Sequence, residues 1–161
     1  MKVIVSDTTS LIALEGLATL DLLCKLFQQV VIPEVVFNEL VTGSQTIAHQ
    51  IQTLACIEIV QIPSSEQLHH LLLIIDQGEA EAITLALEKQ LPILIDERKG
   101  RSIAQQKGLI VIGFLGILVL ATQRAVLTNH EAKTLLEQAI KNGFQLSEKL
   151  HQQIIPVFNL Q

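Results

Sequence analysis

Five short apolar runs recur along the chain, and they limit the folds that it can adopt. The runs are rich in Val, Ile and Leu, and they span residues 2–6, 29–33, 57–62, 92–95 and 109–112. Between them lie longer segments with helical spacing of apolar residues. Strands that are apolar on both faces are typical of a parallel sheet with helices on either side. The sequence therefore predicts one α/β domain with a central, mostly parallel sheet and a helical C-terminal portion.

Length and composition agree with a single folded chain. The 161 residues are enough for one domain with a proper core, and charged residues make up only 17%. The formal net charge of −5 does not by itself favour nucleic acid as a partner. The most hydrophobic segment, residues 109–122, is interrupted by Gly113 and Gly116, and it is shorter than the roughly 20 residues that span a bilayer. We expect a cytoplasmic protein that does not use a membrane.

The two cysteines, Cys24 and Cys56, lie far apart in apolar surroundings. They do not have the close spacing of a metal-binding pair. Two thiols in the core of a protein from a reducing cytosol are the ordinary interpretation. We therefore expect both cysteines to be free and buried.

Two aspartates come directly after predicted strands. Asp7 follows the run that ends at residue 6, and Asp96 follows the run that ends at residue 95. Because the carboxyl ends of parallel strands meet at one edge of a sheet, the two carboxylates could be neighbours there, where such folds bind ligands. Each could instead be a turn residue or the N-cap of the next helix.

Three glutamates stand in apolar helical segments. Glu39 shares a helix face with Val35 and Val36, although it would also suit the wet edge of that helix. Glu79 shares a face with small apolar residues, and Glu81 points about 200° away from it. An acid near a helix N-terminus is also favoured by the helix dipole, which is the plainer explanation for Glu79 and Glu81.

A group of carboxylates at one edge would repel each other unless a cation joined them. Oxygen ligands without Cys or His nearby suit Mg²⁺ or Mn²⁺ and not zinc. Such an ion can activate a water and stabilise charge on a phosphate. The acids therefore indicate phosphodiester chemistry without a protein nucleophile.

Bases follow the second aspartate closely. Of the 11 Lys and Arg residues, four fall within ten positions: Arg98, Lys99, Arg101 and Lys107. A phosphate backbone needs cations beside an anionic metal site, so these side chains are candidates for substrate binding. The alternative is an ordinary solvated helix face. The five histidines are scattered over helical segments and away from the acids.

Four blocks of sequence occur together in an order that resembles a known family. They read IVSDTTSLIAL, VVIPEVVFNEL, DQGEAEAITLALE and LIDERKGRSIAQQKGLIVIGFLGIL. In that order and spacing, they resemble the PIN-domain family, and most of all short prokaryotic members that are often the toxins of type II toxin–antitoxin pairs. The resemblance covers roughly residues 1–125 and leaves 126–161 as a helical extension, which we expect to pack on the same domain.

The resemblance implies a fold and a site. The fold is a three-layer α/β/α sandwich, and its acids hold Mg²⁺ or Mn²⁺. Matched by position, the expected catalytic acids and metal ligands are Asp7, Glu39, Glu79 and Asp96, with Glu97 as a further ligand and with Glu81, Thr8 and Ser10 as additional candidates. Arg98, Lys99 and Arg101 would bind substrate. Two positions depart from the family pattern, since Ser10 replaces a usual proline and Phe114 replaces a usual threonine.

The resemblance implies a metal-dependent endoribonuclease, the toxin of a toxin–antitoxin pair. RNA would be the substrate, a small antitoxin the inhibitor, and a second copy the partner in a homodimer. An alternative is a catalytically silent module that binds a protein or nucleic acid. A nucleotide-binding or signalling domain fits less well, because no glycine-rich phosphate loop follows the first strand and a receiver's lysine is missing after the last.

Overall fold

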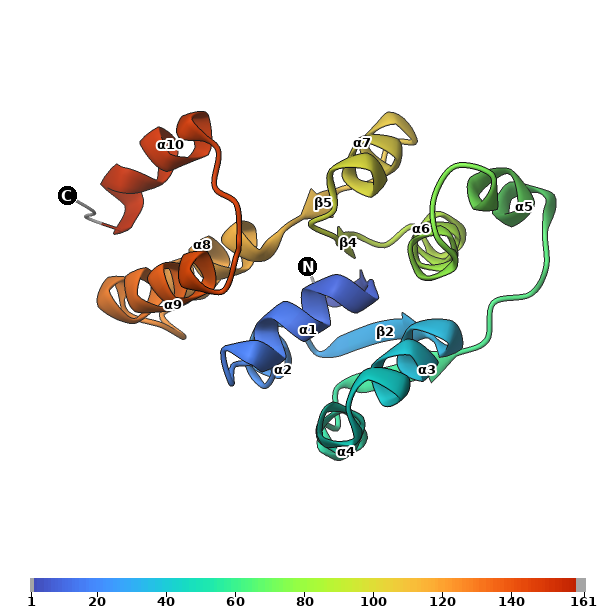
Figure 1. Cartoon of the computed structure of the whole chain (residues 1–161), viewed down its shortest axis with the longest axis horizontal. Helices are drawn as coiled ribbons and strands as arrows, with labels where there is room; N and C mark the ends of the chain where they lie inside the picture. Colours follow the sequence, from blue (N-terminus) through green and yellow to red (C-terminus); the bar gives the residue numbers. More distant parts are fainter. Residues whose placement is uncertain (1, 159–161) are drawn as a thin grey trace. The chain divides into compact units, whose positions relative to one another are not determined.

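The computed structural model describes residues 2–158, and it divides into two compact units after Phe114. The first unit holds the sheet and most of the helices (Figure 1). The second unit is built from helices.

The first unit is organised around a five-stranded sheet in which every pairing is parallel. The strands are β1 (Val3–Ser6), β2 (Gln29–Pro33), β3 (Ile57–Val60), β4 (Ile93–Leu94) and β5 (Val111–Ile112). All five coincide with the predicted apolar runs. β2 has the predicted bounds and the other four strands are shorter by one or two residues, although Ile95, just after β4, still donates a backbone hydrogen bond to Ile112 at 3.0 Å.

The strand order β3-β2-β1-β4-β5 places the first strand in the middle. The chain moves outward from β1 to β3, returns to the other side of β1, and moves outward again to β5. Ligand sites in open α/β sheets lie at the carboxyl ends of the strands where this reversal occurs. Here the reversal lies between β1 and β4, where Ser6 is opposite Leu94.

Helices of the first unit connect the strands. They are α1 (Thr8–Gly16), α2 (Leu22–Leu26), α3 (Glu34–Gly43), α4 (Gln45–Thr53), α5 (Glu66–Leu72), α6 (Gln77–Lys89) and α7 (Arg98–Gln106). Ser44 and Ser65 cap α4 and α5 as their side chains accept backbone hydrogen bonds. Asp7 caps α1, which is one of the alternatives that the sequence left open for this residue.

Both faces of the sheet are covered, which gives the predicted three-layer α/β/α arrangement. On one face Val5, Val31 and Ile93 belong to a cluster that includes apolar residues of α5, α6 and α7. The alternate strand residues, such as Ile4 and Leu94, are also fully buried. Because both sets of side chains are excluded from water, the strands read as continuous apolar runs in the sequence.

The second unit contains most of α8 (Phe114–Gln123), together with α9 (Asn129–Lys141) and α10 (Glu148–Phe158). Thr128 and Glu131 form a capping box at the start of α9. Pro156 lies inside α10, which continues to Phe158. The proline lies in the final turn, where it removes a single intrahelical hydrogen bond. None of the helices in the described part of the chain is long and apolar enough to cross a membrane.

The expectation of two free core thiols is wrong. Cys24 of α2 and Cys56, which precedes β3, form a disulfide with a Cα–Cα distance of 5.5 Å and a sequence separation of 32. Both residues are partly exposed. Pairing of β2 with β3 brings the segments that carry Cys24 and Cys56 together. The separation of the two cysteines along the sequence gave no sign of this proximity.

Loss of this disulfide is expected to destabilise the first unit. A closed loop of this length contributes about 2–4 kcal/mol by restricting the unfolded chain. Urea unfolding of Cys24→Ser, Cys56→Ser and the double variant, each beside the oxidised wild type, measures the effect. The three variants should lose similar amounts. A double variant as stable as the wild type would show that the bond contributes nothing.

Candidate active site

Asp7 lies at the carboxyl end of β1 and is almost completely buried, with 1% of its surface exposed. Its Oδ1 accepts a hydrogen bond of 3.1 Å from the backbone N–H of Ser10, as the N-cap of α1. Its Oδ2 is buried and has no hydrogen-bond partner among the described residues. Burial raises the pKa of Asp7 to about 6, although the hydrogen bonds from Ser10 oppose the shift.

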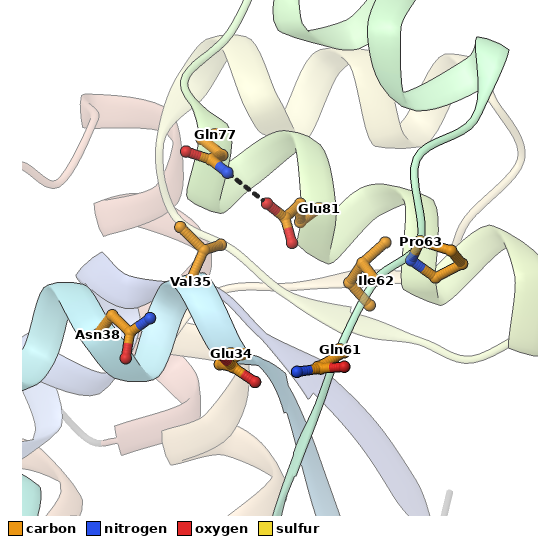
Figure 2. Close-up of a pocket in the computed structure, with 8 residues that line it drawn as sticks. All are labelled: Glu34, Val35, Asn38, Gln61, Ile62, Pro63, Gln77 and Glu81. Atoms are coloured by element: carbon orange, nitrogen blue, oxygen red, sulfur yellow. Dashed lines mark hydrogen bonds between the residues drawn. The ribbon is translucent and has the colours of Figure 1, made fainter.

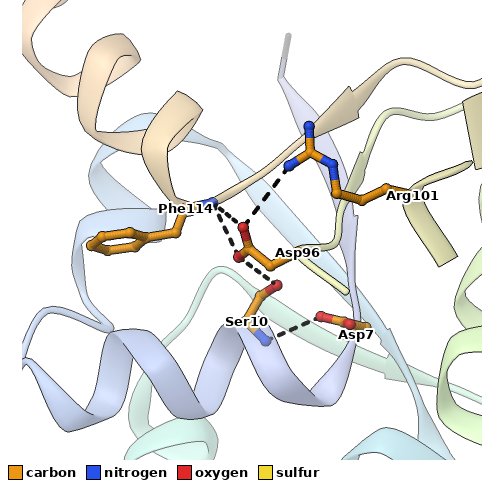
Figure 3. Close-up of polar contacts among 5 residues, drawn as sticks. All are labelled: Asp7, Ser10, Asp96, Arg101 and Phe114. Atoms are coloured by element: carbon orange, nitrogen blue, oxygen red, sulfur yellow. Dashed lines mark hydrogen bonds and ion pairs between the residues drawn. The ribbon is translucent and has the colours of Figure 1, made fainter. Parts of the chain in front are cut away.

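Ser10 joins Asp7 to Asp96, as Figure 3 shows. While its backbone N–H binds Asp7, its hydroxyl donates to Oδ2 of Asp96 at 3.4 Å. The backbone N–H of Phe114 donates to both oxygens of Asp96, at 2.9 and 3.1 Å. The two aspartates that follow β1 and β4 are therefore neighbours, as the parallel sheet predicted.

Arg101 of α7 reaches the same carboxylate. Its Nη1 lies 4.0 Å from Oδ1 of Asp96, which is a loose ion pair. Burial raises the pKa of Asp96, while the Phe114 N–H and the Arg101 charge act in the opposite direction. Arg101 is half-buried beside the acids, so it can offset the charge of an approaching anion without leaving its helix.

Glu39 of α3 contacts the start of α1. Its Oε2 accepts a hydrogen bond of 2.7 Å from the hydroxyl of Thr8, the residue after Asp7. Glu39 is exposed, so it lies at the open side of the cluster. The sequence could only suggest a role for Thr8. In the structure its hydroxyl orients the Glu39 carboxylate toward the edge of the sheet that Asp7 occupies.

Glu79 of α6 is buried, with 9% of its surface exposed, and its Oε2 lacks a hydrogen-bond partner within the described chain. Burial raises the pKa of Glu79 to about 8, and contact with Asp76 and the charges of Asp76 and Glu97 add to the shift. Burial also raises the pKa of Glu97, but backbone N–H groups of Gly100 and Lys99 outweigh it and lower that pKa overall. Glu97 caps α7 through a 2.7 Å hydrogen bond from Gly100.

Three glycines make room for the acids. A Cβ on Gly78 would lie 2.9 Å from Oε1 of Glu39, and a Cβ on Gly100 would lie 2.6 Å from Oε2 of Glu79. A Cβ on Gly113 would lie 2.6 Å from Oδ1 of Asp96. Each distance is shorter than a normal contact, so any larger residue would displace a carboxylate.

The structure separates some of the predicted residues from this group. Glu81 is buried, but its carboxylate accepts from Gln77 at 2.8 Å and lines a pocket on the α3 side of α6. Arg98 and Lys99 are exposed at the start of α7. In the structure, Glu79 and not Glu81 adjoins Asp76 and Glu97.

Sequence analysis missed Asp76. It caps α6 by accepting a 2.9 Å hydrogen bond from the backbone N–H of Glu79, and its charge acts on Asp7, Glu79 and Glu97. Its position before Gln77-Gly78-Glu79 was a visible helix-start signal. Nothing in that signal distinguished a cap from a member of the acidic cluster.

The donor set suits a hard divalent cation. Two buried carboxylate oxygens have no partner in the described chain, and all the nearby charged ligand groups are oxygens. In the side-chain positions of residues 2–158, no three acids, cysteines or histidines converge closely enough to form a finished metal cage. Glu39 accepts from Thr8 and Asp96 from Phe114, so loading an ion would require these side chains to rotate.

Comparison with known families settles what kind of domain this geometry belongs to. A family model described as a PIN domain matches residues 3–159. The chain belongs to the PIN-domain family. PIN domains are in general nucleases that use divalent metals, which agrees with the chemistry of the acids. The match extends beyond residue 125, where the resemblance expected from the sequence blocks ends. No curated protein matches the chain.

Removing the buried charge at Asp7 should stabilise the metal-free PIN domain. Because its folded pKa of about 6 exceeds the ordinary value of 3.8, the folded state binds a proton more tightly and loses stability as the pH rises through 6. In EDTA, Asp7→Asn should exceed the wild type in unfolding free energy by up to about 3 kcal/mol at pH 8, and the difference should vanish near pH 4. Denaturant titrations across this range measure it.

Asp21→Asn serves as the control, because Asp21 is exposed and pairs with Lys25 on the surface. It should change stability by less than about 0.5 kcal/mol. Adding Mn²⁺ should stabilise the wild type and not Asp7→Asn, since only the former retains the ligand. If Asp7→Asn were less stable than the wild type at pH 8, burial of a charged Asp7 would be the wrong explanation.

A methyl group at Gly100 should weaken metal binding more than folding. Gly100→Ala places its Cβ against Glu79 and the Ile95 side chain, both of which can shift, while helix propensity gains about 1 kcal/mol. We expect at least a tenfold loss of Mn²⁺ affinity by calorimetry with an unfolding free energy within about 1 kcal/mol of the wild type. Gly16→Ala, with open space around it, should leave metal affinity unchanged. Equal affinities for all three proteins would remove Glu79 from the site.

Proposed function

We propose that this PIN domain is a Mg²⁺- or Mn²⁺-dependent endoribonuclease. The observation that carries the proposal is the pair of buried, unpartnered oxygens of Asp7 and Glu79 at the switch point of the sheet. Unpaired buried oxygens are costly to the fold unless a ligand uses them. Their raised pKa values have the same physical origin, so a divalent cation would relieve both.

Asp7, Glu39, Glu79 and Asp96 would hold the cation, with Glu97 and Asp76 nearby. When bound, the ion supplies Lewis-acid activation of water and stabilisation of the charge that develops on the phosphate. The P–O bond to the leaving group breaks as a new P–O bond to water forms. The chain contributes orientation, since Ser10 and the Phe114 N–H fix the Asp96 carboxylate. Arg101 would bind a nonbridging phosphate oxygen, with Arg98 and Lys99 on the neighbouring backbone.

The finer biological role is also part of the proposal. We propose a cytoplasmic toxin whose antitoxin is a small protein, and a homodimer as the active assembly. The second candidate function is a silent PIN module that binds a partner without cutting. The presence of Phe114 at a position where the family usually has threonine favours this silent module. The contact with Asp96, however, comes from the backbone N–H of Phe114, which any residue but proline supplies.

Cleavage of a mixed structured RNA pool by the purified protein tests the proposal. Cutting should require Mg²⁺ or Mn²⁺ and stop in EDTA, and it should fall by at least about 100-fold in Asp7→Asn and Asp96→Asn. Arg101→Ala should reduce cutting less, by about tenfold, and should raise KM more than it lowers kcat.

The matched controls are Asp21→Asn for the acids and Lys25→Ala for the base, both on the exposed surface of the first unit. Cutting that persists in Asp7→Asn would place the activity elsewhere or in a contaminant. If the wild type binds Mn²⁺ and RNA but does not cut, the silent module is the better description.

A further inference from the structure

A second feature lies at the same edge of the sheet, beside the acids. An open pocket of about 510 Å³ is lined by the first turns of α3 and α6 and by the segment that follows β3. Figure 2 shows Glu81 of α6 facing Val35 of α3 and Ile62 across this space. The pocket adjoins the candidate active site, because Asn38 and Gln77 line it and their chain neighbours Glu39 and Gly78 contact each other.

The charges of the pocket exclude a phosphate as its occupant. Glu34 and Glu81 both line it, and no Lys, Arg or His occurs among the described residues of its wall. A negative group would meet two carboxylates without a compensating cation. A ligand with hydrogen-bond donors would instead suit Glu81.

The remaining wall combines apolar and polar groups. Val35, Ile62 and Pro63 provide apolar surface, while the amides of Asn38 and Gln61 offer both donors and acceptors. Pockets that combine apolar walls with a few placed polar groups are typical of small-molecule and base recognition. Unstacked bases of single-stranded RNA are read in this way, through their Watson–Crick edges.

Glu81 is the most constrained group of the pocket. Only 8% of its surface is exposed, and Gln77 holds its Oε2 with a 2.8 Å hydrogen bond. A carboxylate oxygen accepts more than one hydrogen bond, so both oxygens remain able to bind a ligand. A fixed carboxylate with two parallel acceptors matches two adjacent N–H donors on one ligand edge.

We propose that this pocket binds an unstacked guanine base of the RNA, next to the phosphodiester that is cut. Guanine alone among the four bases presents an imino N–H and an amino group side by side, for the two oxygens of Glu81, and its O6 can accept from an amide such as Asn38 or Gln61. This inference rests on the proposed function, since that function supplies the RNA. A basic protein segment would also donate hydrogen bonds to Glu81, but its cationic side chains would have no acceptor for the amide N–H groups of Asn38 and Gln61.

Two measurements on the full chain test the guanine pocket. The first maps cleavage sites in an RNA of random sequence for the wild type and for Glu81→Gln. The amide replaces an acceptor with a donor, so preference for guanine beside the cut should fall by about tenfold or more. Glu88→Gln, an exposed position on the same helix, should keep the wild-type preference.

The second measurement compares the binding of guanosine, adenosine, cytidine and uridine by saturation-transfer NMR in EDTA. Guanosine should give the strongest signal with the wild type, and this signal should disappear with Glu81→Gln.

The outcomes separate this inference from the proposed function. Metal-dependent cutting without base preference would overturn the guanine pocket and leave the nuclease intact. Equal loss of cutting at every site in Glu81→Gln would also overturn it, because Glu81 would then act as a metal ligand. If nothing is cut, the nucleoside spectra decide, since guanosine binds only where the pocket recognises it. Binding of an arginine-rich peptide through Glu81, without guanosine binding, would identify a protein partner and overturn the proposal.

Discussion

Parallel pairing of β1 with β4 is the constraint on which the rest of the site depends. Because Ser6 lies opposite Leu94, the two strands end at the same level, and Asp7 and Asp96 follow them at the same edge of the sheet. Ser10 then binds both carboxylates, since α1 begins directly after β1. A shift of one residue in this register would move one acid along the edge by about 3.3 Å relative to the other. The fold therefore sets the spacing of the first two acids before any ligand is present.

Burial gives these acids their chemical character. Asp7 and Glu79 lie where water does not reach one of their oxygens, and their pKa values rise to about 6 and about 8. A fold that only needed stability would place apolar groups there, since an unpaired buried carboxylate is costly. The same cost becomes binding energy when a cation supplies the missing partner. Glycines at 78, 100 and 113 keep the space beside the carboxylates open.

Helices α3 and α6 each have two sides that face different groups of residues. One side of each helix presents Glu39 or Glu79 to the edge where Asp7 lies, and another side lines the pocket that contains Glu81. Glu79 and Glu81 thus have different neighbours, Asp76 and Glu97 for the first and Gln77 for the second, because helical positions two apart face different directions. If both proposals hold, α3 and α6 fix the position of the cleavage site relative to the base-binding pocket, because both helices pack on the same strands.

The sequence by itself predicted the architecture and the approach of Asp7 to Asp96 at one edge of the sheet. Apolar runs fix strands, and the positions of Asp7 and Asp96 after two of them place both at the carboxyl edge in any parallel sheet. It could not determine the Cys24–Cys56 bond, the role of Asp76 or the place of Glu81. Those depend on which segments meet across the sheet and on how far a side chain is removed from water. Neither is encoded in local spacing, since both arise only when distant segments pack together.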